Sequence, residues 1–195
     1  SFANKAAMEK NNRQQGKATR GGGFPLRTGG FTLIEMMVTV GILAVLLAMV
    51  APSFRGLLLD NQAATQADAL VTSLMFARSE AIKRNVPVVM CRSNTGTDCA
   101  GSDWASGWIV FADADRSGSG AVTTGDPILQ VVGKLSGKFT LTTGSESGFT
   151  YRPDGAVTTA DNFQLCPPDK VTSRARQIQV EASGRPVVVK GGTCS

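Results

Sequence analysis

The feature that most constrains the fold is an uncharged stretch of nineteen residues, Met36–Phe54. Together with the apolar residues just before it, this stretch reaches the roughly 20 residues that an α-helix needs to cross a bilayer. Basic residues lie only on its N-terminal side, because residues 1–30 carry six lysines and arginines and one glutamate. Since such residues stay in the cytoplasm, we expect residues 1–30 there, residues 31–54 in the membrane, and the rest in the periplasm or outside the cell.

The position of the net charge bears on the possible partners. The chain has a formal net charge of +5, and residues 1–30 account for all of it. From Phe31 onward the chain is formally neutral. Its composition therefore gives no general reason to expect binding to nucleic acid.

A helical pattern continues beyond the uncharged stretch. Small and apolar residues recur at spacings of three or four, as expected for one buried stripe of a helix. They are Leu59, Ala63, Ala67, Leu70, Leu74, Ala77 and Ala81. We expect a helix from Phe31 to about Asn85, with residues 55–85 as its amphipathic half, ending before the Val86-Pro87 pair.

The remaining residues, 86–195, predict an antiparallel β-domain, because short apolar runs alternate with turns rich in glycine, aspartate and serine. The expected strands are Val88–Arg92, Trp108–Phe111, Ile128–Val132, Phe139–Thr142, Gly148–Arg152, Asn162–Cys166, Ala175–Glu181 and Pro186–Lys190. The apolar stripe of the helix must be buried, and one face of a sheet is the obvious partner. The predicted fold class is therefore α+β, a long N-terminal helix packed on a C-terminal antiparallel sheet or sandwich.

Four cysteines follow the hydrophobic stretch: Cys91, Cys99, Cys166 and Cys194. An even number on the side of the membrane opposite the basic leader indicates two disulfides in an oxidising compartment. A metal site is disfavoured because the chain has no histidine and no C-x-x-C pair. Three pairings are possible; we favour Cys91–Cys99, which closes a short polar loop, and Cys166–Cys194, which ties down the C-terminus.

The sequence Gly29-Gly30-Phe31-Thr32-Leu33-Ile34-Glu35 resembles the processing site of type IV prepilins. The resemblance implies cleavage between Gly30 and Phe31 by an inner-membrane prepilin peptidase, which also methylates the new Phe31 amine. A glycine lets the backbone enter a protease cleft. Cleavage there would remove all six basic residues of the leader, so that the helix loses its cytoplasmic anchor.

Glu35 is a carboxylate close to the start of a membrane helix, where an unpaired charge is costly. One interpretation is that it sits at headgroup level, favoured by the dipole of the helix N-terminus. The prepilin resemblance favours another, in which Glu35 pairs with the Phe31 amine of a neighbouring subunit during fibre assembly.

The β-domain is similar to the GspH/FimT family. The similarity lies in Gly107–Asp115, Gly125–Leu129, the strand-turn Phe149–Gly155 and the hairpin Ala175–Arg185, in that order. It implies a long helix on a β-sandwich-like domain, as in pseudopilin H. It also implies a minor subunit that primes or caps a type IV pilus, with the minor pseudopilin H of type II secretion as the alternative.

The family resemblance further implies a location and a set of partners. We expect a single-pass protein of the bacterial inner membrane with a periplasmic C-terminal domain, which is later incorporated into a pilus or pseudopilus. The expected partners are the prepilin peptidase and methylase, the other pilins or pseudopilins of the fibre, and the inner-membrane assembly platform.

The turn Asp113-x-Asp115-x-Ser117 resembles the start of a calcium loop, whose oxygen ligands alternate. The glutamate expected at the twelfth position is replaced by Thr124. We therefore favour a polar hairpin turn, in which aspartate, serine and glycine are common for local reasons, and expect no metal.

A DNA-binding minor pilin is a lesser alternative. Some FimT-like proteins bind DNA through a basic C-terminal hairpin, and here Arg174, Arg176, Arg185 and Lys190 could contact phosphates. The second arginine of the expected G-R-x-R pattern is missing after Gly184, and no aromatic residue for base stacking is evident nearby. Binding to nucleic acid is thus possible but disfavoured, compared with a charged strand edge that deters aggregation.

Enzymatic function finds little support in the sequence. The chain has no histidine, no phosphate-binding loop and no nucleophile elbow. We therefore predict no catalytic residues and no cofactor.

Overall fold

The fold is described from a computed structural model that covers residues 30–144 and 148–194, without side-chain detail at positions 50–53. Of the predicted leader, only Gly30 falls within these residues. The chain forms two compact units, which divide between Leu46 and Leu47.

The N-terminal helix α1 spans Leu33–Arg84, 52 residues in all. It ends where the sequence predicted, because Asn85 adopts a left-handed conformation with φ 55° and the Val86-Pro87 pair follows. A left-handed residue directly after the last helical turn is a common helix terminator.

The β-domain contains eight strands and two short 3-10 helices. The strands are β1 (Val88–Arg92), β2 (Trp108–Ala112), β3 (Ile128–Val132), β4 (Thr140–Thr143), β5 (Phe149–Tyr151), β6 (Asp161–Cys166), β7 (Arg176–Val180) and β8 (Pro186–Lys190); the 3-10 helices are η1 (Trp104–Ser106) and η2 (Thr172–Arg174). They form two four-stranded antiparallel sheets, with strand orders β3-β2-β1-β5 and β4-β6-β7-β8.

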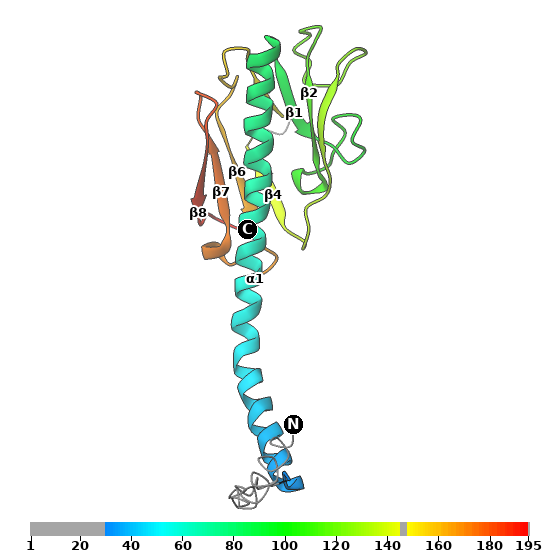
Figure 1. Ribbon diagram of the computed structural model, residues 1–195. Coiled ribbons are helices and arrows are strands. Elements are labelled where there is room, and N and C mark those ends of the chain that lie inside the picture. The colour runs from blue at the N-terminus through cyan, green and yellow to red at the C-terminus, as the bar shows by residue number, and fades with distance from the viewer. Residues whose placement is uncertain (1–29, 145–147, 195) are drawn as a thin grey trace, which may run out of the picture. The chain divides into compact units, whose positions relative to one another are not determined.

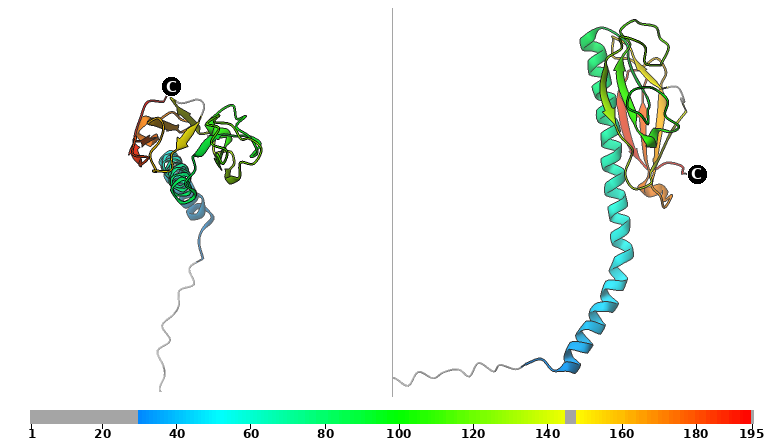
Figure 2. Two further views of the ribbon diagram at one scale, coloured as in Figure 1. Left: turned by 90° about the horizontal axis from the view of Figure 1, so that it is seen from above. Right: turned by 90° about the vertical axis from the view of Figure 1, so that its right-hand side faces the viewer.

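Both sheets pack on the second half of α1, with β6, β7 and β8 on one side of the helix and β1 and β2 on the other (Figures 1 and 2). The predicted stripe faces them. Six of its seven residues, Ala63, Ala67, Leu70, Leu74, Ala77 and Ala81, are at most 1% exposed, and Leu59 is half-buried. This confirms the predicted fold class, with the difference that the stripe is covered by two sheets rather than one.

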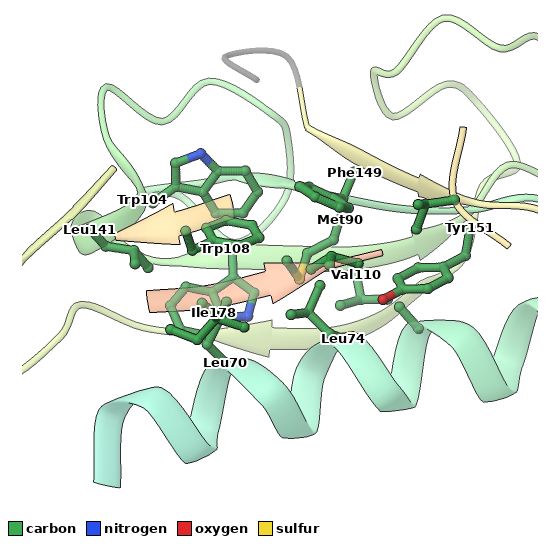
Figure 3. Close-up of a cluster of buried hydrophobic side chains, with 14 of the residues drawn as sticks. Leu70, Leu74, Met90, Trp104, Trp108, Val110, Leu141, Phe149, Tyr151 and Ile178 are labelled. Carbon is green, nitrogen blue, oxygen red and sulfur yellow. The ribbon is translucent and has the colours of Figure 1, made fainter. Parts of the chain in front are cut away.

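The main core lies between the helix and the two sheets (Figure 3). Leu70 and Leu74 of α1 meet Trp108 of β2 and Ile178 of β7, and the ring of Phe163 contacts those of Trp104 and Phe149. These contacts join elements that lie far apart in the sequence, and they hold both sheets on the helix.

Strands β1 and β2 are buried on both faces. Their second face forms a smaller cluster of Val89, Cys91, Ile109 and Phe111, covered by Cys99 and Val122 from loops. This explains why both strands are continuous apolar runs rather than alternating patterns.

Three predicted strands match the observed ones at both ends, namely β1, β3 and β8, and the limits of the other five differ by no more than one residue at either end. Gly148, with φ 118°, and Arg152, whose amide bonds to the Ala156 carbonyl in a turn, fall outside β5. The fourth strand begins and ends one residue later than predicted, because Thr143 still pairs with Phe163 of β6.

The structure joins Cys91 to Cys99 and Cys166 to Cys194, the pairing favoured from the sequence. The first disulfide fixes the loop that covers the outer face of β1. The second ties the C-terminal segment to Cys166, the last residue of β6, which precedes the loop that leads to η2.

Candidate functional site

The predicted processing site lies in an open part of the chain. A side chain at Gly30 would meet no other atom within 4 Å, and its backbone does not adopt the left-handed conformation that favours glycine. Phe31 is 77% exposed. Nothing in the described fold requires glycine at position 30.

Glu35 lies in the first turn of α1, where the Thr32 hydroxyl accepts a hydrogen bond from the Glu35 amide at 3.2 Å. Threonine before the helix and glutamate three residues later have the spacing of a capping box. The cap explains why the helix begins at Leu33 rather than at the predicted Phe31. Sequence reasoning missed this role of Thr32, although the T-x-x-E spacing could have revealed it.

Every side chain from Phe31 to Met49 is exposed in the isolated chain. Among the residues that the structure describes, no single helix meets the length and hydropathy expected of a membrane span. Two segments of α1, Leu33–Met49 and Phe54–Arg84, meet these criteria only when they are taken together as a bent pair. An exposed apolar surface of this size requires cover from another phase or another molecule.

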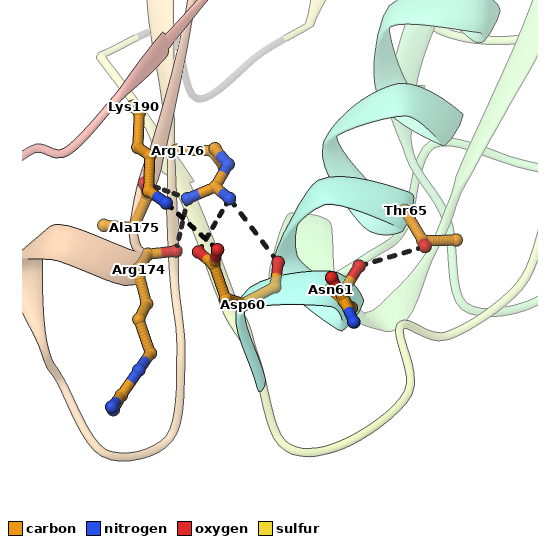
Figure 4. A network of polar contacts seen from close by, with 7 residues as sticks. All are labelled: Asp60, Asn61, Thr65, Arg174, Ala175, Arg176 and Lys190. Atoms are coloured by element: carbon orange, nitrogen blue, oxygen red, sulfur yellow. Dashed lines mark hydrogen bonds and ion pairs between the residues drawn. The ribbon is translucent and has the colours of Figure 1, made fainter. Parts of the chain in front are cut away.

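Asp60 of α1 is the centre of an ion-pair network with the last two strands (Figure 4). Its carboxylate accepts hydrogen bonds from Arg176 at 2.8 Å and from Lys190 at 3.0 Å. The Arg176 side chain is only 9% exposed, and it also donates to the backbone carbonyls of Arg174 and Ala175. The hydrogen bond from Arg176, followed by that from Lys190, lowers the pKa of Asp60.

The four basic residues considered for DNA binding do not form one patch. Arg176 and Lys190 share Asp60, and Arg174 pairs with Asp169. Arg185 follows the turn whose Ser183 carbonyl accepts a hydrogen bond from Arg78 of α1.

Arg78 lies eighteen residues beyond Asp60 on the helix, which corresponds to roughly 27 Å. The predicted patch is therefore corrected: three cations gather near Asp60 and are held in ion pairs, while Arg185 lies at the opposite end of the strand pair. The sequence could not show this, because the acidic partner comes from a helix more than a hundred residues earlier.

The acidic turn after β2 brings together Asp113, Asp115 and Asp126, whose carboxylate oxygens lie within 4.8 Å of one another. Asp126 lies two residues after Thr124, which takes the twelfth position of the loop, so the calcium-loop spacing does not predict it as a member of this group. The turn's own groups bind these oxygens, since Ser117 and Gly118 amides donate to Asp113 and the Thr123 and Ala114 amides donate to Asp126. This arrangement fits the polar hairpin turn favoured from the sequence.

Comparisons with known proteins place these features in context. A family model described as "Type II transport protein GspH" matches residues 66–184, and one described as "Prokaryotic N-terminal methylation motif" matches residues 26–51. No curated protein matches the sequence.

Two solved structures are similar to the chain. The type IV minor pilin FimU of Pseudomonas aeruginosa is 18% identical, with a TM-score of 0.51, over 69% of this chain and 96% of that chain. The minor pseudopilin EpsH from the type 2 secretion system of Vibrio cholerae is 13% identical, with a TM-score of 0.47, over 66% of this chain and 97% of that chain. The likeness to FimU shows a shared fold.

Proposed function

The chain belongs to the family described as type II transport protein GspH, and on that premise we propose that it is a minor structural subunit of a pilus-like fibre. In this proposal it primes or caps the assembly of a type IV pilus. Its partners are the prepilin peptidase and methylase, the other subunits of the fibre, and the inner-membrane assembly platform. The match of residues 26–51 to the N-terminal methylation motif supports the processing step.

One observation carries the proposal: the apolar helical surface from Phe31 to Met49 is exposed along its whole length in the isolated chain. Before assembly, the subunit is in the inner membrane with its β-domain in the periplasm, and lipid covers this surface. Helices of other subunits cover the same surface in the fibre. A surface that suits both environments must be free of charge all round, and residues 36–49 of this segment meet that condition.

The proposed processing site fits this role sterically. Gly30 is open on all sides, so a peptidase can reach the bond to Phe31 without disturbing the helix, which begins two residues later. Cleavage removes the six basic residues that hold the helix end in the cytoplasm. The processed helix then leaves the bilayer at a lower free-energy cost.

Glu35 suits a contact with a second subunit because its amide is bonded within the helix cap and its side chain is exposed. We propose that its carboxylate pairs with the positively charged Phe31 amine of a neighbouring subunit. In an apolar fibre core, this pair would neutralise two charges that are costly when buried singly.

Glu35→Ala should therefore leave cleavage after Gly30 intact and reduce incorporation into the fibre at least tenfold. The expected reduction follows from the penalty of burying the Phe31 amine without a partner, which amounts to a few kcal/mol. Immunoblots of sheared fibres and of membrane fractions measure incorporation and processing in the same cells.

Asp68→Ala, which removes another exposed carboxylate from the same helix, is the matched control and should assemble normally. Normal incorporation of Glu35→Ala would contradict the pairing.

The second candidate is a minor pseudopilin of a type II secretion system, which the description of the matching family favours. Both candidates use the same processing, membrane insertion and helix packing. Deletion of the gene separates them: loss of twitching and DNA uptake supports the pilus, whereas loss of exoprotein secretion supports the secretion machine.

A further inference from the structure

We propose that the end of the β-domain nearest the membrane segment is a contact surface for the phosphate groups of lipid headgroups. This headgroup surface consists of Arg55, Lys170, Val171, Arg174 and Lys190. The inference rests on the proposed insertion of residues 31–54 in the membrane. It adds a second membrane contact, made by the folded domain itself.

The position of the surface follows from the chain. The uncharged stretch ends at Phe54, and Arg55 is the first charged residue after it. A helix inserted through such a stretch places this first charge at headgroup level. Directly beside it lies a hollow of about 480 Å³, lined by Gly56, Leu57, Asp60, Ser173, Arg174 and Lys190.

Arg174 lies against the helix at this level. The guanidinium covers Gly56, where an added side chain would come within 3.1 Å of the Arg174 Cζ atom. In Figure 4 the Arg174 side chain points away from Asp60 and its network. The β-domain thus places the Arg174 guanidinium against the helix at Gly56, the residue that follows Arg55.

Positive charge exceeds negative charge at this end of the domain. Five cations lie there: Arg55, Lys170, Arg174, Arg176 and Lys190. Their ion-pair partners are two carboxylates, Asp60 and Asp169. Five cations against two anions leave an excess of three positive charges. Lys190 keeps 61% of its side chain exposed despite its contact with Asp60.

The loop that carries Lys170 is both exposed and firmly held. Residues 168–173 are exposed, and Val171 presents an apolar side chain, 36% exposed, next to Lys170. The Lys170 amide donates to the Pro167 carbonyl, the Arg174 amide donates to the Val171 carbonyl, and the disulfide at Cys166 anchors the loop's start. Apolar and basic side chains side by side suit the boundary between headgroups and water.

Phosphates of nucleic acid would offer similar chemistry, but the position of the surface favours lipid. As long as the helix is inserted, it holds these cations beside headgroups, so that no encounter with a second macromolecule is needed. After the leader is removed, this surface is also the main group of cations that remains next to the membrane segment.

Hydrogen exchange of the full-length chain in lipid nanodiscs tests the proposal. We compare discs of phosphatidylcholine with discs that contain phosphatidylglycerol, and follow the amides of residues 169–174. Each basic residue at an anionic surface strengthens association about fivefold. We expect exchange here to slow severalfold in the anionic discs at low salt, and the difference to vanish at 1 M salt. Amides of the distant turn at residues 182–185 should exchange equally in both discs.

Variants identify the residues responsible. Arg55→Gln with Lys170→Gln removes two exposed cations and should abolish most of the difference between the discs. Lys83→Gln is the matched control, since it removes an exposed cation from the last turn of α1, and it should retain the difference.

Equal exchange in the two discs would overturn the inference and leave the proposed membrane insertion intact. Protection in neutral discs by added inorganic phosphate or duplex DNA would also overturn it, in favour of an isolated anion site or a nucleic-acid surface. A chain that enters neither disc would remove the proposed insertion itself, and with it this inference.

Discussion

Replacing Trp108 by alanine is expected to lower the free energy of unfolding by about 3–5 kcal/mol, the usual cost of deleting a large buried aromatic side chain. Trp108 is 0% exposed and lies where α1, β2 and β7 meet, beside Leu70 and Ile178 (Figure 3). The cavity would open between the helix and both sheets. Urea denaturation of the detergent-solubilised chain, followed by circular dichroism, measures the change.

Two further variants show whether volume or hydrogen bonding matters at this position. The Trp108 indole N–H has no hydrogen-bond partner among the described residues. Trp108→Phe keeps most of the ring and deletes this buried donor, so it should cost far less than alanine. Val131→Ala, at an exposed position on β3, should change the free energy by less than about 0.5 kcal/mol. An equal loss for Phe and Ala at position 108 would contradict the packing account.

Asp60→Ala is expected to lower the free energy of unfolding by about 2–3 kcal/mol, because it leaves Arg176 buried without its carboxylate. Removing one partner of a fully buried ion pair costs 3–5 kcal/mol. The loss should be smaller here, because the Asp60 side chain is 28% exposed and the arginine keeps its bonds to backbone carbonyls. The same urea measurement applies.

A double variant tests the reason for this loss. Asp60→Leu combined with Arg176→Met replaces the pair by apolar side chains and should recover most of the stability lost in Asp60→Ala. If the double variant does not regain stability, the loss in Asp60→Ala comes from a change in the helix itself and not from the unpaired charge of Arg176.

The same pair predicts a dependence on pH. The pKa of Asp60 is lowered from its ordinary value of 3.8, chiefly by Arg176. Its contribution to stability is therefore complete above that value and is lost as the pH falls through the native-state pKa. The difference in stability between the natural chain and Asp60→Asn should be constant near neutrality and shrink below about pH 4. A difference that grows on acidification would contradict the assignment.

The helix, the strands and the processing motif could be predicted from the sequence because each depends on local signals. The stripe from Leu59 to Ala81 has helical spacing, and Asn85 and Pro87 mark the helix end. The β-rich runs are bounded by glycine and polar turns, so their predicted limits differ from the observed strands by at most one residue at either end.

The arrangement of the sheets could not be predicted, because it depends on contacts between distant segments. The division of eight strands into two sheets follows from packing around Leu70, Leu74 and Phe163, which no local pattern encodes. The same limit applied to the basic residues. Arg176 resembled a surface cation in the sequence, and only the fold brings Asp60 to it from α1.

Processing at Gly30 is the step on which the proposed assembly depends, and the mass of the N-terminal peptide measures it most directly. The chain is expressed in a bacterium that carries a prepilin peptidase, and the membrane fraction is digested and analysed by mass spectrometry. The account predicts a chain that begins at Phe31 and carries one methyl group on its amine. A chain that still bears residues 1–30, in cells whose own pilins are processed, would contradict it.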